Sequence, residues 1–324
     1  MTQHVKIIGS GVSGLTVAVL LLEDGFDVEI LTKKFPNDTT SAKAAAIWFP
    51  YEVNPKDKAE TWSKQSYFKF LELCDIPNSG VSMVDLTVLI EKPEDAWWLK
   101  ALPDDKIRKA IPEELPKGFP LGYIMQVPLI ETQLYLDFLL SRFKALKGTL
   151  TKRSITNLQE LEDSNTLLVN CAGLGSRALV NDVGLYPIHG QIIKAEPQSE
   201  TPCIVADFGF ETTKDRLAYV VPRKDCIILG GTAIKDYEDL NPNAEFTEGI
   251  IRRCHLVAPN LKPINIQSVE VGLRPGRSEI RLERIGNLIH NYGHGGGGFT
   301  VSWGCAMEVK KLIRELLKKL KTKV

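Results

Sequence analysis

The chain has 324 residues, and apolar residues make up 44% of them, as in an ordinary globular protein. This length allows one large domain or two packed lobes. Forty basic residues balance forty acidic ones, so the overall charge favours neither nucleic acid nor an anionic membrane as a partner. No apolar run reaches bilayer length, and the first residues lack the pattern of a signal peptide, so we expect a soluble protein of the cytoplasm.

The six cysteines are scattered along the chain, without a C-x-x-C pair or a histidine cluster at metal-ligand spacing. We predict that they are buried thiols in a reducing compartment. We expect no metal site.

The first elements are predicted as a strand at residues 5–8, a helix at 14–23 and a second strand at 28–31, which together form a β-α-β unit. Between the first strand and the helix lies a G-x-G-x-x-G motif made by Gly9, Gly11 and Gly14, with Val12 and Ser13 inside it. In this setting the motif is typical of dinucleotide binding, because the glycines let backbone approach a pyrophosphate at the helix N-terminus.

The acidic residue that usually ends the second strand and binds a ribose hydroxyl is missing. Thr32, Lys33 and Lys34 stand there instead. The ribose is then held either by main chain or with the help of a lysine that reaches a phosphate.

The next stretch has three hydroxyl side chains, Thr39, Thr40 and Ser41, followed by small residues up to Ala46. Hydroxyls can bind pyrophosphate oxygens, and small side chains let a flat ring lie against the backbone. A solvated loop leading into a helix explains the same stretch equally well.

The middle of the chain is predicted to contain a second lobe. Prolines and tryptophans between 93 and 128 indicate irregular structure, while 129–147 has helical periodicity and 167–173 is typical of a buried strand of the first sheet. Short alternating runs predict antiparallel strands at 191–195, 218–221, 226–229 and 268–272, and an amphipathic helix is predicted at 303–320.

A candidate anion site follows these runs. Arg274, fixed between a strand and a proline, could bind a carboxylate through two parallel hydrogen bonds, although arginines are more often surface or ion-pair residues. Arg277 and Arg281 have Glu279 and Glu283 close by, and we interpret both arginines as structural.

Together the motifs resemble the D-amino-acid oxidase family, including its D-aspartate oxidase relatives. The resemblance covers essentially the whole chain and rests on motifs in family order: the first glycine motif, Thr39 to Tyr51, Val169 to Gly173, Pro187 to Gln191, Tyr219 to Pro222, Gly230-Gly231, Leu273-Arg274-Pro275 and His290 to Gly296. The combination of the last two is quite specific to the family.

This resemblance implies an FAD-dependent enzyme that oxidises a D-amino acid to an imino acid and reduces oxygen to hydrogen peroxide. The imino acid then hydrolyses to a 2-oxo acid and ammonia. In this family the substrate's α-hydrogen leaves as hydride to flavin N5, so no general base and no catalytic side chain is expected.

The resemblance also implies roles for individual residues. Arg274 would pair with the substrate carboxylate, Tyr219 would donate a hydrogen bond to it, and the main chain of Gly296 would accept from the amino group, while Asp215, Arg216 and Phe49 would also face the substrate. The start of the last helix, with Thr300, would face the flavin C2 carbonyl. The cofactor-binding residues implied are Gly9, Gly11, Val12, Ser13, Gly14, Lys33, Lys34, Thr39, Thr40, Ser41, Ala45, Ala46, Ile47, Ile155, Gly173, Arg274, Gly295, Gly296, Gly298, Phe299 and Thr300.

The implied fold class is α/β, with a Rossmann-like FAD-binding domain and an interleaved antiparallel-sheet substrate domain. The FAD-binding domain would take residues 1–50, 129–186 and 276–324, and the substrate-binding or lid domain residues 51–128 and 187–275.

Three departures from the family pattern bear on the substrate. Asp215 and Arg216 stand where a second lid tyrosine is frequent, Gly297 replaces an aromatic residue, and Phe49 replaces a polar one. They predict a more open or differently charged roof over the substrate. Arg216 could attract an acidic side chain and Asp215 a basic one, or the two could pair on the surface. Neutral D-amino acids remain the expected substrates.

His290 and His294 are predicted to be structural, with ring nitrogens bonded to nearby main chain. The other functions considered are a D-aspartate or D-glutamate oxidase, a glycine or sarcosine oxidase, a nicotinamide-dependent dehydrogenase and a non-catalytic dinucleotide-binding sensor. The expected partners are a D-amino acid, oxygen and a second copy of the chain as a homodimer, without nucleic acid or membrane.

Overall fold

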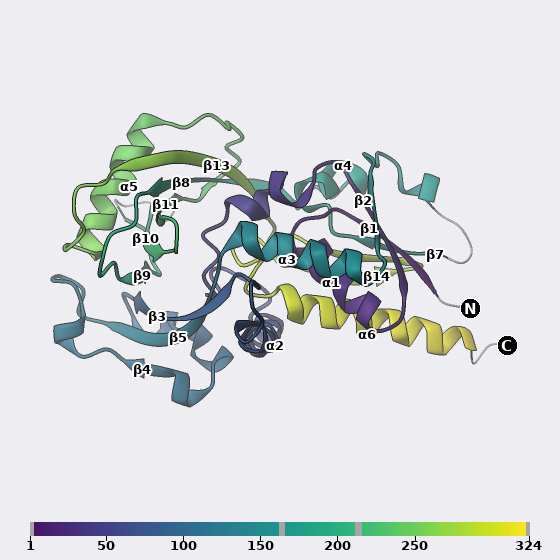
Figure 1. The fold of residues 1–324 in the computed structure, drawn as a ribbon, viewed down its shortest axis with the longest axis horizontal. Helices are drawn as coiled ribbons and strands as arrows, with labels where there is room; N and C mark the ends of the chain where they lie inside the picture. The colour runs from purple at the N-terminus through teal and green to yellow at the C-terminus, as the bar shows by residue number, and fades with distance from the viewer. Residues whose placement is uncertain (1–2, 162–165, 211–215, 322–324) are drawn as a thin grey trace.

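The computed structural model describes residues 3–161, 166–210 and 216–321. Figure 1 shows two lobes side by side. One holds β1, β2 and β7 with α1, α3 and α6, and both chain ends lie at its far side. The other holds β8 to β11 and β13 with α5, above β3 to β5.

The helices are α1 (Val12–Glu23), α2 (Lys56–Cys74), α3 (Thr132–Ala145), α4 (Ser176–Leu179), α5 (Ala244–Val257) and α6 (Ser302–Lys321). The strands are β1 (His4–Ile8), β2 (Asp27–Thr32), β3 (Val81–Leu89), β4 (Ile107–Lys109), β5 (Gly122–Ile130), β6 (Thr149–Lys152), β7 (Thr166–Asn170), β8 (Tyr186–Ala195), β9 (Cys203–Ala206), β10 (Arg216–Pro222), β11 (Ile227–Thr232), β12 (Ile234–Lys235), β13 (Ile266–Gly276), β14 (Arg281–Ile285) and β15 (Leu288–Tyr292).

The first sheet has the strand order β14-β15-β7-β1-β2-β6 in the described part of the chain. Its neighbours run parallel except for β14 and β15. Because β1 lies between β2 and β7, Ile8 is opposite both Leu31 and Asn170, and the carboxyl ends of these strands meet at one edge. In such a sheet ligands bind beyond this edge.

Helix α1 is buried over most of its circumference because it packs against both α3 and α6 as well as the sheet. This explains its nearly uniform apolar sequence, which lacks a polar face. The position of its N-terminus is therefore fixed by packing on several sides.

The second sheet has the order β12-β8-β11-β10-β9-β3-β5-β4, with β13 also paired to β8, among the residues described. All of its pairs are antiparallel except β3 with β9. The predicted α/β class, with a Rossmann-like part and an antiparallel part, is confirmed.

The helix predicted at 129–147 starts later than expected. Leu129 and Ile130 belong to β5, where they face Ser82 and Val81 of β3, and α3 begins at Thr132. Apolar periodicity alone cannot separate the end of a buried strand from the start of a helix. The segment expected to be irregular likewise contains β4 and most of β5.

One apolar core joins the two lobes, because α2, α3 and α6 pack with β3 and β5 in a single cluster. At its centre Trp303 donates a 2.9 Å hydrogen bond from Nε1 to the hydroxyl of Tyr135. The cysteines are free thiols, and all are buried except the half-buried Cys74, which corrects its expected full burial. No helix of the described residues is long and apolar enough to cross a bilayer.

Candidate active site

The first glycine motif forms a tight turn at the carboxyl edge of the first sheet. Gly9 has a φ of +105°, and a Cβ there would lie 2.5 Å from the carbonyl oxygen of Cys171. A Cβ on Gly14 would collide with the carbonyl oxygen of Gly9. Only glycine fits at these two positions, so strand, turn and helix can pack at backbone distance.

The hydroxyl-rich segment reaches the same helix end. The Val12 N–H, in the first turn of α1, donates to Ser41 Oγ at 3.0 Å, and a Cβ on Gly11 would lie 3.1 Å from that oxygen. Unpaired N–H groups and the helix dipole make this end a binding site for negative charge. The structure thus brings together two segments that the sequence assigns to one pyrophosphate, and Thr39 lies in the same group.

The end of β2 carries hydroxyls where dinucleotide-binding proteins usually have an acid. The hydroxyls of Ser10 and Thr32 both lie 2.7 Å from the carbonyl oxygen of Lys34. The Lys33 and Lys34 side chains are exposed. Ile155 packs beside Ile8 and Leu31, close to the ends of β1 and β2.

The loop of small residues crosses between the lobes. Ala46 has a φ of +53° and accepts a 2.9 Å hydrogen bond from Ile130 N–H. Ile47 forms an isolated antiparallel bridge with Leu129 of β5. From β10's end, Arg223 donates to the carbonyl oxygens of this loop, a contact that the sequence analysis missed.

Thr300 holds the other end of this loop. Its hydroxyl accepts from the Phe49 N–H at 3.2 Å and donates to the Phe49 carbonyl at 2.9 Å. Both hydrogen bonds of the Thr300 hydroxyl thus go to the backbone of Phe49. Any contact of this region with a flavin would therefore come from the main chain near Thr300. Phe49 is buried, with its ring edge-on to Trp98 at 5.3 Å between centroids.

The last glycine segment lies beside the strand that carries Arg274. Gly295, with a φ of +52°, donates from its N–H to the carbonyl of Pro275 at 2.8 Å. A Cβ on Gly296 would lie 2.9 Å from the Tyr51 ring, and one on Gly297 would collide with Val53. The Gly297 position therefore provides space for the Val53 side chain. It does not open the roof over the substrate, which its departure from the family pattern predicted.

The two histidines of this segment are buried and neutral at pH 7. Burial lowers the pKa of His294 and of His290 to about 4. His294 lies 3.0 Å from Asn291 Oδ1 and 3.5 Å from Ser13 Oγ, so its partners are side chains, which corrects the expectation of main-chain partners. Its ring links the last glycine segment to the first turn of α1.

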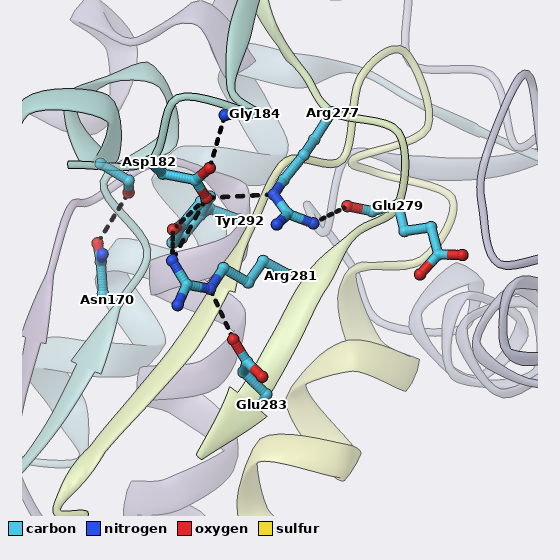
Figure 2. Close-up of polar contacts among 9 residues, drawn as sticks. Asn170, Asp182, Gly184, Arg277, Glu279, Arg281, Glu283 and Tyr292 are labelled. Carbon is cyan, nitrogen blue, oxygen red and sulfur yellow. Dashed lines mark hydrogen bonds and ion pairs between the residues drawn. The ribbon is translucent and has the colours of Figure 1, made fainter. Parts of the chain in front are cut away.

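Figure 2 shows a polar network around Asp182 that includes Tyr292, the last residue of β15. Asp182 Oδ2 accepts from Tyr292 at 2.8 Å and from Arg277 Nε at 3.1 Å, and Arg281 Nη1 lies 3.4 Å away. Burial alone would raise the pKa of Asp182, but the Tyr292 hydroxyl and the Arg277 charge outweigh burial and lower it. Arg281 also binds the carboxylate of Glu283, whereas the bond from Arg277 to Glu279 goes to the backbone carbonyl oxygen.

Arg274 and Tyr219 meet across the second sheet. Arg274 donates from Nη1 to the carbonyl of Thr232 at 2.9 Å, and its charge lies near enough to the Tyr219 phenol to act on the pKa of that group. Burial raises the pKa of Tyr219 although the Arg274 charge opposes the shift, so the phenol stays protonated and can donate. The Tyr219 ring lies where a Cβ of Gly230 would be.

Arg274 lines a cavity of about 160 Å³ between the lobes, together with Tyr51 and the backbone of Gly295 and Gly296. Tyr51 was not among the predicted site residues, although it ends the Trp-x-Pro-Tyr motif. Burial, with the neighbouring Glu52 charge, raises its pKa, so it too is a neutral phenol.

Of the two charged residues predicted for the roof, only Arg216 is described, and it lies apart from this cavity. Asp215 is outside the described residues. The Arg216 guanidinium lies 4.9 Å from the ring centroid of Phe246 on α5, and Arg216 does not line the cavity. The structure therefore does not place Arg216 next to a substrate.

These parts fit an extended dinucleotide better than a compact ligand. The glycine turn and the Ser41 hydroxyl at the start of α1 fit a pyrophosphate, and Ile155 gives one end an apolar wall. At the other end the small-residue loop and Gly296 flank the cavity that holds Arg274. No group of three or more metal-binding side chains occurs among residues the structure describes.

Comparisons with known proteins agree with this geometry. A family described as FAD dependent oxidoreductase matches residues 4–312. The chain is 38% identical over 315 residues to a D-amino-acid oxidase of Rubrobacter xylanophilus, covering 94% of each protein. It is 39% identical over 332 residues to a D-amino-acid oxidase of Dictyostelium discoideum, covering 98% of this chain and 93% of that protein.

A solved structure of glycine oxidase from Geobacillus kaustophilus has a TM-score of 0.80 to this chain at 16% sequence identity. The match covers 97% of this chain and 95% of that one. At this identity the likeness concerns the fold alone.

Proposed function

The chain belongs to the family of FAD-dependent oxidoreductases, and from this premise we propose that it is a D-amino-acid oxidase. The overall reaction converts a D-amino acid, oxygen and water to a 2-oxo acid, ammonia and hydrogen peroxide. The bound FAD supplies the electron acceptor for the amino acid and the donor for oxygen.

One arrangement carries the proposal. Arg274, whose charge lies near the Tyr219 phenol, lines the cavity that Gly295 and Gly296 also line. A guanidinium and a neutral phenol form a donor set for a carboxylate, and a carbonyl beside them is an acceptor for an amine. These are the two groups that every α-amino acid presents.

The protein's residues contribute binding and orientation. Arg274 and Tyr219 hold the carboxylate, the Gly296 carbonyl accepts from the amino group, and Tyr51 closes the wall next to it. The start of α6 stabilises negative charge near Thr300 through the helix dipole. His290 and His294 are neutral at pH 7, and the His294 ring is bonded to Asn291 and Ser13, which agrees with a reaction that needs no general base from the protein.

The cavity wall favours a neutral substrate side chain. Tyr186, Ile188 and Ile280 are among the lining residues, and the charged lining residues are Glu52, Lys235, Arg274 and Arg277. Arg277 is paired with Asp182 and Arg274 is assigned to the carboxylate, which leaves Glu52 and Lys235, of opposite sign, to meet the substrate side chain. Neutral D-amino acids are therefore the proposed substrates.

A peroxide-coupled assay of the FAD-loaded protein tests the proposal. D-alanine and larger neutral D-amino acids should give peroxide, whereas L-alanine, glycine and sarcosine should give little. Turnover of glycine and sarcosine without D-alanine would make the protein a glycine-type oxidase. Preference for D-aspartate would overturn the neutral specificity, and a colourless protein that cannot take up FAD would overturn the oxidase proposal.

We also propose that residues 1–50, 129–186 and 276–324 act as the FAD-binding domain and that 51–128 and 187–275 act as the substrate domain. The free cysteines support a cytoplasmic location, which cell fractionation would test. The homodimer is proposed from the resemblance alone, and sedimentation at micromolar concentration would measure it.

A further inference from the structure

Arg223 joins the second sheet to the small-residue loop. It follows β10 directly, and its side chain is 5% exposed. Nη2 donates to the carbonyl oxygens of Ala44 at 2.8 Å and Ala45 at 2.6 Å, and Nη1 lies 3.3 Å from Thr132 Oγ1. One guanidinium thus fixes two consecutive peptide units of the loop.

Fixing these carbonyls also fixes the direction of the next N–H groups. In a trans peptide the C=O and the N–H of the same unit point in opposite directions. The units after Ala44 and Ala45 are trans, because the cis bonds lie elsewhere. The N–H groups of Ala45 and Ala46 therefore point away from Arg223.

No acceptor for these two N–H groups occurs among the hydrogen bonds of the residues described. Ala46 itself is 8% exposed, and backbone donors that are buried are nearly always paired in native proteins. Two parallel donors on a loop of small side chains fit the carbonyl and ring-nitrogen edge of a flavin.

The charge of Arg223 is balanced locally. Glu131 Oε2 lies 4.0 Å from Arg223 Nε, and Oε1 accepts from the Lys224 N–H at 3.1 Å. The carboxylate thus balances the guanidinium charge without a hydrogen bond to Nε, while Nη2 holds the loop. A buried arginine that loses one of its partners strongly destabilises the protein. We therefore expect this arrangement to be rigid.

We propose that Arg223 is a positioning residue for FAD: by holding the carbonyls of Ala44 and Ala45, it turns the N–H groups of Ala45 and Ala46 toward the flavin ring. The inference rests on the proposed FAD enzyme. Its alternative is a structural role in which Arg223 only joins the two lobes.

The test compares Arg223→Met, Arg223→Lys and the control Lys224→Met, which removes the neighbouring exposed charge. FAD affinity of the apoprotein is measured by quenching of flavin fluorescence, the environment of bound flavin by its visible absorption bands, and apoprotein stability by thermal unfolding. Arg223→Met should weaken FAD binding about tenfold or more, equivalent to ~1.4 kcal/mol. Its bound flavin should absorb more like free FAD.

Arg223→Lys should bind FAD with intermediate affinity, because an ammonium cannot fork to both carbonyls. Lys224→Met should match the wild type. Wild-type FAD affinity and spectrum in both Arg223 variants would overturn the proposal, and so would a lower unfolding temperature without a change in affinity. If Arg223→Met does not fold, the test rests on Arg223→Lys alone: wild-type FAD affinity and a wild-type spectrum in that variant would overturn the proposal. A wild-type protein that binds no FAD would overturn the proposed function itself.

Discussion

Single side chains decide substrate binding in this site. Replacing Arg274 by Ala removes the charged donor from the cavity, and charged hydrogen bonds contribute about 1.5–3 kcal/mol. We expect KM for D-alanine to rise about 10- to 100-fold while FAD stays bound. Steady-state kinetics and the flavin absorbance of the purified variant measure the two effects separately.

The half-buried Arg284 on β14 offers a matched control, since its guanidinium donates to the carbonyl of Gly286 and does not line the cavity. Arg284→Ala should leave KM unchanged. An unchanged KM in Arg274→Ala would reject its role as the carboxylate partner.

Buried His294 should make stability depend on pH. Its folded pKa of about 4 lies below the usual 6.5, so between these values the unfolded chain binds the additional proton. The free energy of unfolding should therefore be fully retained above pH 6.5 and fall by about 1.4 kcal/mol per pH unit as the pH drops toward 4.

Urea unfolding of the FAD-loaded protein between pH 7 and pH 5 measures this slope. His294→Gln removes the titrating ring and should reduce the slope by about that amount, although its stability at pH 7 will also change. An identical slope in wild type and variant would contradict the assignment.

At the scale of elements, the segment before α6 packs against the segment before α2, where Gly297 leaves space for the side chain of Val53. A Cβ on Gly297 collides with the buried Val53 side chain. Overpacking of this kind typically costs about 1–3 kcal/mol, so Gly297→Ala should lower the free energy of unfolding by that amount. Adding Val53→Ala should recover part of the loss, since residues in contact do not behave additively.

Gly298→Ala provides the control, because its Cβ would lie 3.7 Å from the Cβ of His294, an ordinary contact. Denaturant unfolding of the four variants and the wild type measures the coupling. If the losses in unfolding free energy from Gly297→Ala and Val53→Ala simply add in the double variant, the two positions are not in contact.

The network in Figure 2 links the loop before β8 to β14 and β15. Asp182→Ala leaves Arg277 and Arg281 without their shared carboxylate, and breaking a buried ion pair costs about 3–5 kcal/mol. We expect a loss of this size in unfolding experiments. Glu279→Ala should be nearly neutral, because the Glu279 side chain is exposed and Arg277 binds only its carbonyl. Equal effects of the two variants would contradict this assignment.

Elements built from local signals could be predicted from the sequence. The strand-glycine-helix unit at Gly9 depends on residues close in the chain, and α6 has a clear amphipathic pattern, so both were placed well. The start of α3 was not, because only pairing with β3 shows that Ile130 is still strand.

At the scale of the whole molecule, the site depends on contacts between distant segments. Tyr51 approaches Gly296, and Arg223 reaches Ala44, through packing of the two lobes that no local pattern encodes. The resemblance pointed to Arg274, which lines the cavity, and to Tyr219, whose role stays a prediction, but it could not show that Val53 fills the space beside Gly297. Such pairs require the three-dimensional structure.

The order of the first sheet also affects how the protein is made. Strand β15 pairs with β7, and α6 packs on α1, so elements that are synthesised late complete a sheet that β1 and β2 begin early. Until then the nascent chain exposes the apolar surface of α1, which makes it a target for chaperones and proteases. We expect FAD to load only onto chains that include α6, and a chain stalled before Ser302 to be degraded.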